Sequence, residues 1–279
     1  MTPFILDCEG VKLVTNMVNL RKYGNKPFPV AVIHGGPGAP GEMAPVAQEL
    51  SSVIGVLEPL QTATTLEGQV RELKAVLEKH AALPVTLIGF SWGALLSFIF
   101  TARHPSLVKK LILIGSAPYQ EEYAANIAQT RLSRLGKEER EEALSLMQAL
   151  SDPSLADKNM PLAQLGKLLS KSDSYDPLPH DDEILECQYD VFQGVWEQAE
   201  QLRSSGKLLE LGKRIKCPVV ALHGDYDPHP AEGVAEPLSR ILKDFRFILL
   251  EKCGHRPWLE RNARDRFYDI LKQELVSQL

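Results

Sequence analysis

A serine, an acidic residue and a histidine each follow a separate apolar segment of this 279-residue chain. Ser91 lies in the stretch Gly89-Phe90-Ser91-Trp92-Gly93, Asp227 follows Gly224, and His255 follows Cys253-Gly254. A serine hydroxyl becomes a strong nucleophile when a histidine takes its proton and an acid orients that histidine. The three residues predict covalent catalysis by Ser91, with His255 as the base and Asp227 as the acid.

The segment around Ser91 fits the pattern G-x-S-x-G, which is typical of a sharp turn from a strand into a helix. Small residues on both sides of the serine allow the strained backbone that exposes its hydroxyl. An apolar strand-like run precedes this segment, and a helical pattern over residues 94–103 follows it. The context therefore agrees with the role that we predict for Ser91.

Two of these assignments leave an alternative open. Asp225 also follows the same strand-like run as Asp227, and we prefer Asp227 because it lies further past the end of that run and Pro228 fixes the chain after it. His255 is the leading base, but His229 is close to Asp227 in sequence and is kept as a candidate.

Attack by a serine creates a negative oxygen that needs preorganised N–H donors. We predict one donor at the backbone amide of Trp92, at the start of the helix after Ser91, where the helix dipole favours an anion. The second donor is predicted at Gly36, in the loop His34-Gly35-Gly36-Pro37-Gly38, because a glycine lets the backbone approach a substrate closely. The spacing of this loop does not fit a phosphate-binding G-x-G-x-x-G motif.

The predicted site residues follow segments that are apolar almost throughout, and these segments must position them. Such segments are typical of strands covered on both faces by helices. A mostly parallel sheet follows, and its ligands would bind at the carboxyl ends of the strands. A weaker strand is predicted at 53–57, one or two antiparallel edge strands at 4–20, and helices at 66–80 and 137–150. The five clearest strand candidates are 29–33, 85–89, 111–115, 218–222 and 245–250.

The stretch between the third and fourth of these strands has a different composition, rich in Glu, Gln, Lys and Leu and interrupted by prolines. It predicts a helical insertion that interrupts the sheet domain. We expect a core in two parts, 1–117 and 214–279, with a helical cap at 118–213.

Composition excludes several classes of protein. Apolar residues make up 44% and charged residues 24% of the chain, as in ordinary globular proteins, and the net charge of -5 disfavours nucleic acid and anionic membranes as partners. The first residues do not resemble a signal peptide, so a cytoplasmic location is expected. The four scattered cysteines indicate neither a zinc site nor disulfides, and no metal or cofactor is predicted.

The order oxyanion loop, Ser91, Asp227, His255 resembles the α/β-hydrolase superfamily, over about residues 28–117 and 214–279. The resemblance implies the α/β-hydrolase fold, with the insertion in the usual cap position. The His-Gly-Gly-Pro-Gly loop at 34–38 looks like that of the proline iminopeptidases, in which a cap carboxylate holds the free amine of the substrate. Trp196 and Glu197 are similar to the Trp-Glu pair that supplies such a carboxylate.

Two departures weaken the peptidase assignment. The chain reads Glu58-Pro59-Leu60-Gln61 where that family usually has an Asp-Gln-Arg-Gly-type loop, and Phe90 precedes Ser91 where the peptidases prefer glycine. The sequence therefore predicts a serine hydrolase that acts on a small-molecule ester, amide or short peptide. The alternatives are a hydrolase of carbon–carbon bonds with the same three residues and a hydrolase-like receptor with slow turnover. Nothing in the sequence indicates an oligomeric state.

Overall fold

The computed structural model describes residues 19–180 and 187–276. Its seven strands form one sheet in the order β1-β3-β2-β4-β5-β6-β7, in which β1 pairs antiparallel with β3 and all other neighbours pair in parallel. The mostly parallel sheet that we expected is confirmed. The strands are β1 Leu20–Tyr23, β2 Val30–Ile33, β3 Val56–Pro59, β4 Val85–Phe90, β5 Val108–Ile114, β6 Val219–Gly224 and β7 Phe245–Leu250.

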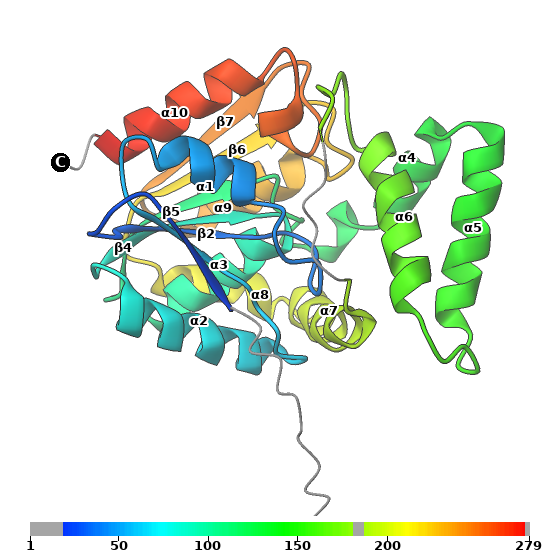
Figure 1. Ribbon diagram of the computed structural model, residues 1–279, viewed down its shortest axis with the longest axis horizontal. Coiled ribbons are helices and arrows are strands. Elements are labelled where there is room, and N and C mark those ends of the chain that lie inside the picture. Colours follow the sequence, from blue (N-terminus) through cyan, green and yellow to red (C-terminus); the bar gives the residue numbers. More distant parts are fainter. Residues whose placement is uncertain (1–18, 181–186, 277–279) are drawn as a thin grey trace, which may run out of the picture.

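Helices cover both faces of this sheet (Figure 1). One face packs against α1 and α10, and the other packs against α2, α3 and α9. The side chains of β2 and β4 are buried along their whole length, as expected for strands between two helical layers. These helices are α1 Ala44–Leu50, α2 Leu66–His80, α3 Trp92–Arg103, α9 Glu232–Ile241 and α10 Arg264–Val276.

The predicted helix at 66–80 matches α2, and its sequence explains where it begins. The Thr65 side chain accepts a hydrogen bond from the Gly68 amide at 3.1 Å, which caps the first turn. Val70, Leu73 and Leu77 lie on one face and are buried against the sheet. Helix α3 is instead apolar on nearly all sides and buried from Trp92 to Ala102, as expected for the helix that follows the central strand.

Two strands begin three residues away from their predicted starts, and the other strand ends shift by two residues or fewer. The predicted strand at 53–57 lies at Val56–Pro59, because the Val53 and Ile54 amides both bond back to the Leu50 carbonyl and extend the turn after α1. Strand β5 begins at Val108, because the buried Lys110 ammonium pairs with the carboxylate of Glu274 at 2.8 Å and so fits inside the sheet. The edge strands predicted at 4–20 lie outside the described residues, except for the start of β1.

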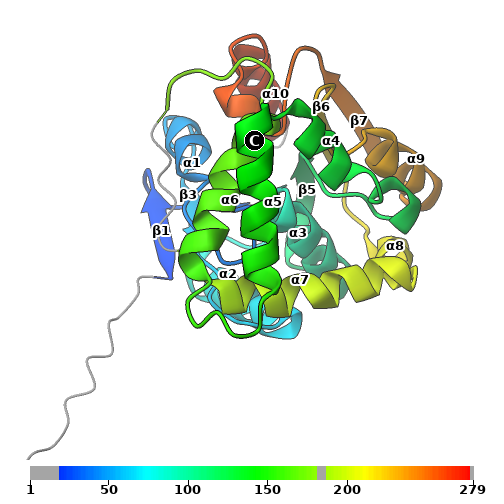
Figure 2. The same ribbon diagram turned by 90° about the vertical axis from the view of Figure 1, so that its right-hand side faces the viewer.

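Helices occupy most of the chain between β5 and β6 (Figures 1 and 2). Three of them, α4 to α6, project away from the sheet and pack around a small core of their own that contains Leu135, Ala143 and Leu165. Helix α7 instead packs against the main core through Val191, Val195 and Ala199. These helices are α4 Ile127–Arg134, α5 Lys137–Ser151, α6 Asn159–Ser172, α7 Tyr189–Ser204 and α8 Lys207–Glu210.

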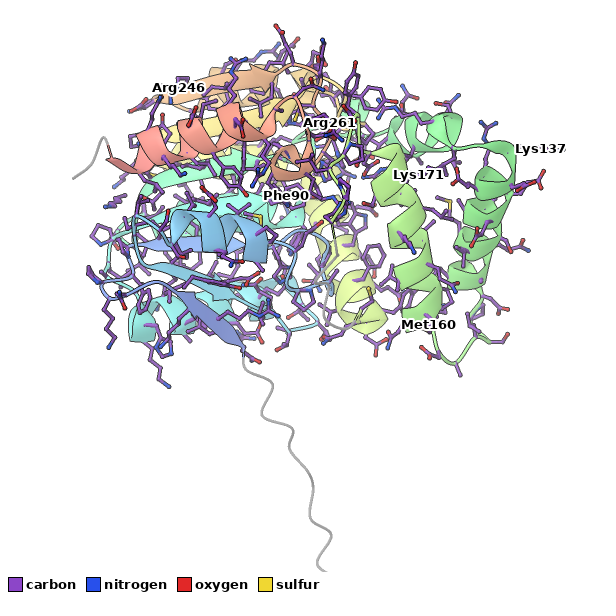
Figure 3. All side chains as sticks on the ribbon, turned by 45° about the horizontal axis from the view of Figure 1, so that its top comes forward. Phe90, Lys137, Met160, Lys171, Arg246 and Arg261 are labelled. Atoms are coloured by element: carbon purple, nitrogen blue, oxygen red, sulfur yellow. The ribbon has the colours of Figure 1, made fainter. Side chains whose placement is uncertain are left out.

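Three short 3-10 turns, Glu121–Tyr123, Leu211–Arg214 and Pro257–Leu259, complete the described elements. Within the two described ranges, no helix combines the length and the apolar character that crossing a membrane requires. The carboxyl ends of the parallel strands lie toward α4–α6. In Figure 3, Phe90 at the end of β4 lies closer to those helices than Arg246 at the start of β7, which lies on the opposite side of the molecule.

Candidate active site

Ser91 lies at a strained turn between β4 and α3. Its φ of 51° and ψ of -114° place a non-glycine residue in a region that L-amino acids rarely adopt. A Cβ on Gly89 would meet the Gly93 carbonyl oxygen at 2.2 Å, and one on Gly93 would meet the Ile33 carbonyl oxygen at 2.3 Å. Both glycines of the G-x-S-x-G pattern are therefore sterically required, because the start of α3 packs directly on the ends of β4 and β2.

His255 and Asp227 meet although 28 residues separate them in the sequence. The Nδ1 atom of His255 lies 2.7 Å from Oδ2 of Asp227, and both side chains are buried. The His255 ring also contacts the ring of Phe90, with 4.7 Å between the ring centres, which places it beside the residue that precedes Ser91. The structure thus brings the predicted acid and base together next to the turn that carries the serine.

The hydroxyl of Ser91 makes no hydrogen bond to any described residue. Contacts between a nucleophile and its base are often long in a protein without substrate and tighten in the substrate complex. The roles of Ser91, His255 and Asp227 in catalysis therefore stay predictions, supported by the position of Ser91 and by the His255–Asp227 hydrogen bond.

The charges of this pair stabilise each other. Burial alone would raise the pKa of Asp227, but His255, His229 and His223 around it lower that pKa well below its usual value. Burial alone would lower the pKa of His255, but the charge of Asp227 and its hydrogen bond raise it above the usual 6.5. Asp227 is therefore a carboxylate near neutral pH, and it favours the protonated form of His255.

We expect turnover to depend on this raised pKa. Only the neutral imidazole of His255 can accept the serine proton, so kcat/KM should rise with pH through a pKa above about 6.5 and fall below it. Measuring kcat/KM on an ester substrate as a function of pH tests this expected rise. A profile that stays flat from about pH 5 to about pH 8 would contradict a histidine base.

Asp225 has a different partner from Asp227. Its Oδ1 atom accepts a hydrogen bond from the backbone amide of Cys253 at 3.0 Å, and the residue is exposed. Asp225 thus holds the loop that carries His255 and is not the acid bonded to the His255 ring. The geometry supports Asp227 as the acid.

The two predicted oxyanion donors lie on elements that touch each other. Trp92 is the first residue of α3, where backbone amides have no partner within the helix. Gly36 has a φ of +29°, in the region that favours glycine. A Cβ on neighbouring Gly35 would meet the ring of Phe90 at 2.8 Å, so this loop packs against the turn at Ser91.

His34 supports this loop. Burial lowers its pKa to about 4, so the ring is neutral near pH 7. Its Nδ1 atom lies 2.7 Å from the Gly35 carbonyl oxygen, and its Nε2 atom lies 3.3 Å from the Gln61 amide. A ring with its proton on Nδ1 satisfies both contacts. The Trp92 indole is fixed in turn by a 2.9 Å bond from its Nε1 to Gln69.

The predicted substrate-binding residues Trp196 and Glu197 lie on α7. Trp196 is partly buried, packs against the main core and stacks on Phe192 with 6.3 Å between ring centres. Glu197 is exposed. Helix α7 is nevertheless close to the oxyanion loop, because the Gln188 amide at its start bonds to the Gly38 carbonyl at 2.8 Å. A role for Glu197 in binding substrate stays a prediction.

One segment that sequence reasoning did not single out holds the His255 loop in place. The carbonyl of Asp173, at the end of α6, accepts a hydrogen bond from the His255 amide at 2.8 Å. A Cβ on Gly254 would meet the same carbonyl oxygen at 2.2 Å. The Asp173 carboxylate forms a bidentate ion pair with the Arg131 guanidinium of α4, with N–O distances of 2.6 to 3.1 Å. These contacts connect α4 and α6 to the backbone of His255, the candidate base.

Glu260 completes this attachment. Its carboxylate is buried and accepts three backbone amides: those of Tyr175 and Asp176 after α6, at 2.9 and 2.8 Å, and that of Gly254 next to His255, at 3.0 Å. No local motif marks Glu260, since its partners at 175 and 176 are 85 and 84 residues away. Glu260 is therefore a positioning residue for the His255 loop.

Replacing Glu260 by glutamine should weaken both the fold and the site. The amide group of glutamine would face at least one backbone N–H, which leaves a buried donor unpaired and costs about 1 to 3 kcal/mol of unfolding free energy. Displacement of His255 should lower kcat/KM by about 10 to 100-fold. Urea unfolding and ester kinetics measure the two effects. Exposed Glu236, replaced in the same way, serves as the control, and unchanged kinetics in Glu260→Gln would contradict the positioning role.

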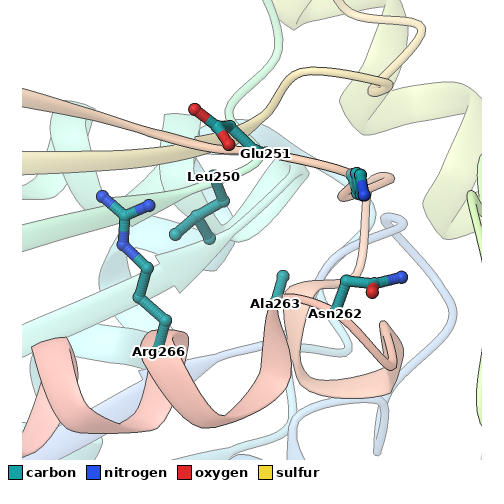
Figure 4. Close-up of a pocket in the computed structure, with 6 residues that line it drawn as sticks. Leu250, Glu251, Asn262, Ala263 and Arg266 are labelled. Atoms are coloured by element: carbon teal, nitrogen blue, oxygen red, sulfur yellow. The ribbon is translucent and has the colours of Figure 1, made fainter.

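A hollow of about 230 Å³ lies between the end of β7 and the start of α10 (Figure 4). The chain segment from Leu250 to Lys252 forms one side, and Asn262, Ala263 and Arg266 form the other. None of the predicted catalytic residues lines it. It is therefore separate from the candidate active site.

Comparison with known proteins agrees with this geometry. The family described as the alpha/beta hydrolase fold matches residues 57–261. The chain belongs to the α/β-hydrolase family. A pimeloyl-[acyl-carrier protein] methyl ester esterase of Chromobacterium violaceum is 25% identical over 212 residues, which cover 73% of this chain and 74% of the relative.

Solved structures share the fold. The crystal structure of VinJ superposes with a TM-score of 0.64 at 19% identity, covering 93% of this chain and 95% of that one. A proline iminopeptidase of Mycobacterium smegmatis superposes with a TM-score of 0.60 at 18% identity, covering 92% and 94%. The predicted α/β-hydrolase fold is confirmed, and the chain is a hydrolase of this family.

Proposed function

We propose that this hydrolase is a serine esterase that cleaves a small-molecule ester through an acyl-enzyme. The single observation that carries the proposal is the 2.7 Å hydrogen bond between His255 and Asp227 beside the strained turn at Ser91. The curated relative named as a methyl ester esterase favours an ester over an amide. We also propose that residues 118–213 act as the cap over this site.

The reaction follows from the roles of these residues. Neutral His255 takes the proton of Ser91 as the serine oxygen attacks the ester carbon, and Asp227 stabilises the imidazolium that forms. The amides of Gly36 and Trp92 bind the negative oxygen of the tetrahedral intermediate. His255 then returns the proton to the leaving alcohol and an acyl-serine remains. Water, deprotonated by His255, attacks the acyl group and releases the acid and free Ser91.

A panel of substrates tests this function. Esters of short and medium acyl chains should be turned over many times per protein chain. If hydrolysis of the acyl-enzyme is the slower step, a rapid burst of one alcohol per protein chain should precede steady release of the acid. Turnover of a β-diketone without ester turnover would favour the carbon–carbon hydrolase. Binding of one small molecule per chain without repeated turnover would favour the receptor.

An aminopeptidase is the second candidate, favoured by the His34–Gly38 loop and by its hydrogen bond to the start of α7, the helix that carries Glu197. A carboxylate that holds the substrate ammonium forms a charge-assisted hydrogen bond. Under this reading, Glu197→Gln should lower kcat/KM for aminoacyl arylamides by about 10 to 100-fold and leave a neutral ester unaffected. Exposed Glu200 on the same helix provides the control substitution. Equal effects on both substrates, or no arylamide turnover in the unmodified enzyme, would remove the aminopeptidase.

A further inference from the structure

His229 has no role in the proposed reaction, yet it is built into the candidate site. The Nδ1 atom of His229 lies 2.8 Å from Oδ1 of Asp227, while Nδ1 of His255 lies 2.7 Å from Oδ2. One carboxylate therefore holds two imidazoles, one on each oxygen. The two rings lie side by side, with 4.6 Å between their centres and 31° between their planes.

The position of His229 is fixed from three directions. Besides its ring contact, its backbone amide donates to Oδ1 of Asp227 at 2.9 Å. Its carbonyl oxygen lies 2.8 Å from Nε2 of His223, a fully buried ring on β6. His229 itself is buried, with 5% of its surface exposed. A histidine held this tightly is not a surface residue that happens to lie near the site.

The contacts with Asp227 also fix the tautomer of both rings. A carboxylate only accepts hydrogen bonds, so each Nδ1 carries a proton and each neutral ring has its lone pair on Nε2. Neither Nε2 atom is hydrogen-bonded to a described residue. Each of the two adjacent imidazoles thus has an available lone pair on Nε2, while its Nδ1 donates to the shared Asp227 carboxylate.

This arrangement is the one that metal-binding histidines adopt, in which the second ring nitrogen donates to a carboxylate that orients the ring and makes it more basic. Asp227, His229 and His255 each have a side-chain nitrogen or oxygen within 4.8 Å of the others, so the three side chains form one compact cluster. Imidazole nitrogen suits zinc and neighbouring transition metals better than magnesium or calcium. The nearby cation Arg131 is neutralised by Asp173 at 2.6 Å, so the site as a whole keeps the negative charge of Asp227.

We propose that His229 and His255 bind a divalent transition metal ion such as Zn²⁺ through their Nε2 atoms, with Asp227 orienting both rings, and that this ion inhibits the hydrolase. Inhibition follows because the metal occupies the lone pair with which His255 would accept the serine proton. The inhibition rests on the proposed function, whereas metal binding does not. The ion is an inhibitor and takes no part in the reaction.

Calorimetric titration of the metal-free full-length protein with Zn²⁺, in a buffer that does not chelate metals, tests binding independently of activity. We expect one ion per chain, with the same affinity in the Ser91→Ala variant. His229→Gln should weaken binding by about 100-fold, since it removes a ligand. His104→Gln, at the end of α3, is the matched control and should bind as the unmodified protein does. Equal affinity in the two histidine variants would overturn the proposal.

Two further measurements keep the result independent of whether His229→Gln folds. Long-range ¹H–¹⁵N spectra of the unmodified protein should show the Nε2 signals of two histidines shifting on addition of Zn²⁺. Addition of Co²⁺ in place of Zn²⁺ should give visible absorption bands typical of Co²⁺ bound by nitrogen ligands. A strong near-ultraviolet band from sulfur ligation would instead assign the ion to a cysteine and overturn the site.

Activity supplies the test of inhibition. Ester turnover should fall as the measured site fills and return on addition of a chelator. Binding that depends on His229 without any loss of turnover would overturn inhibition and leave the metal site. Absence of all ester turnover in the metal-free protein would overturn the proposed esterase function, and the calorimetric result would still decide whether the metal binds.

Discussion

Replacing Ser91 by alanine is expected to lower kcat on the best ester substrate by about 10⁴ to 10⁶-fold. No other described serine lies at a positive φ between the central strand and the helix that follows it. Removal of the hydroxyl leaves only oxyanion stabilisation and binding, which are far weaker than the full reaction. Steady-state kinetics measure the loss, and circular dichroism with thermal unfolding shows whether the fold is kept.

Ser97 provides a matched control for this change. It lies on the same helix, is fully buried, and its hydroxyl has no hydrogen-bond partner in the structure. Ser97→Ala should therefore leave kcat within about twofold, because it removes no hydrogen bond from the described site. A Ser91→Ala enzyme that keeps kcat within tenfold of the unmodified enzyme, after contaminating esterases are excluded, would contradict the nucleophile assignment.

The second large effect is expected for Asp227→Asn, which should lower kcat by about 10³ to 10⁴-fold. The amide group of asparagine would donate where the carboxylate accepts, so the His255 ring would turn or carry its proton on Nε2, the atom that must accept the serine proton. Loss of the negative charge should also lower the pKa of His255, because Asp227 is what raises it. In the residual activity of Asp227→Asn, the rise of kcat/KM with pH should then occur at lower pH than in the unmodified enzyme.

Asp225→Asn is the comparison for this prediction. Its carboxylate oxygen accepts the Cys253 amide, and the carbonyl oxygen of asparagine can accept the same bond. We expect a reduction of about tenfold or less, through a small shift of the His255 loop. Kinetics of both variants on one ester decide the matter, and a larger loss for Asp225→Asn than for Asp227→Asn would move the acid to Asp225.

The fold and the main contact of the site could be predicted because strong local signals mark them. The apolar runs before Ser91 and Asp227 are strands buried on both faces, and the residues after parallel strands meet at one edge of the sheet. The position of Asp227 relative to Gly224 separated it from Asp225, in agreement with the hydrogen bond to His255. Boundaries were less predictable: Val53 is β-branched and yet 57% exposed in a turn.

Other parts of the site depend on contacts that sequence spacing does not show. Glu260 joins two segments more than 80 residues apart, and its sequence neighbours look like an ordinary charged helix start. Helix α7 has many polar residues, yet it shares the main core with α2 and α3. The two-residue spacing of Asp227 and His229 was visible, but only the fold shows that His229 and His255 lie side by side.

Reaction of the folded protein with a fluorophosphonate ester, followed by peptide mapping, tests the central claim most directly. Only an exposed serine activated by a base reacts readily with such a reagent. We expect one label per chain, on Ser91, with no label in Ser91→Ala and slow labelling in Asp227→Asn. A label on another residue, or an unlabelled protein that still turns over esters, would contradict Ser91 as the nucleophile of this hydrolase.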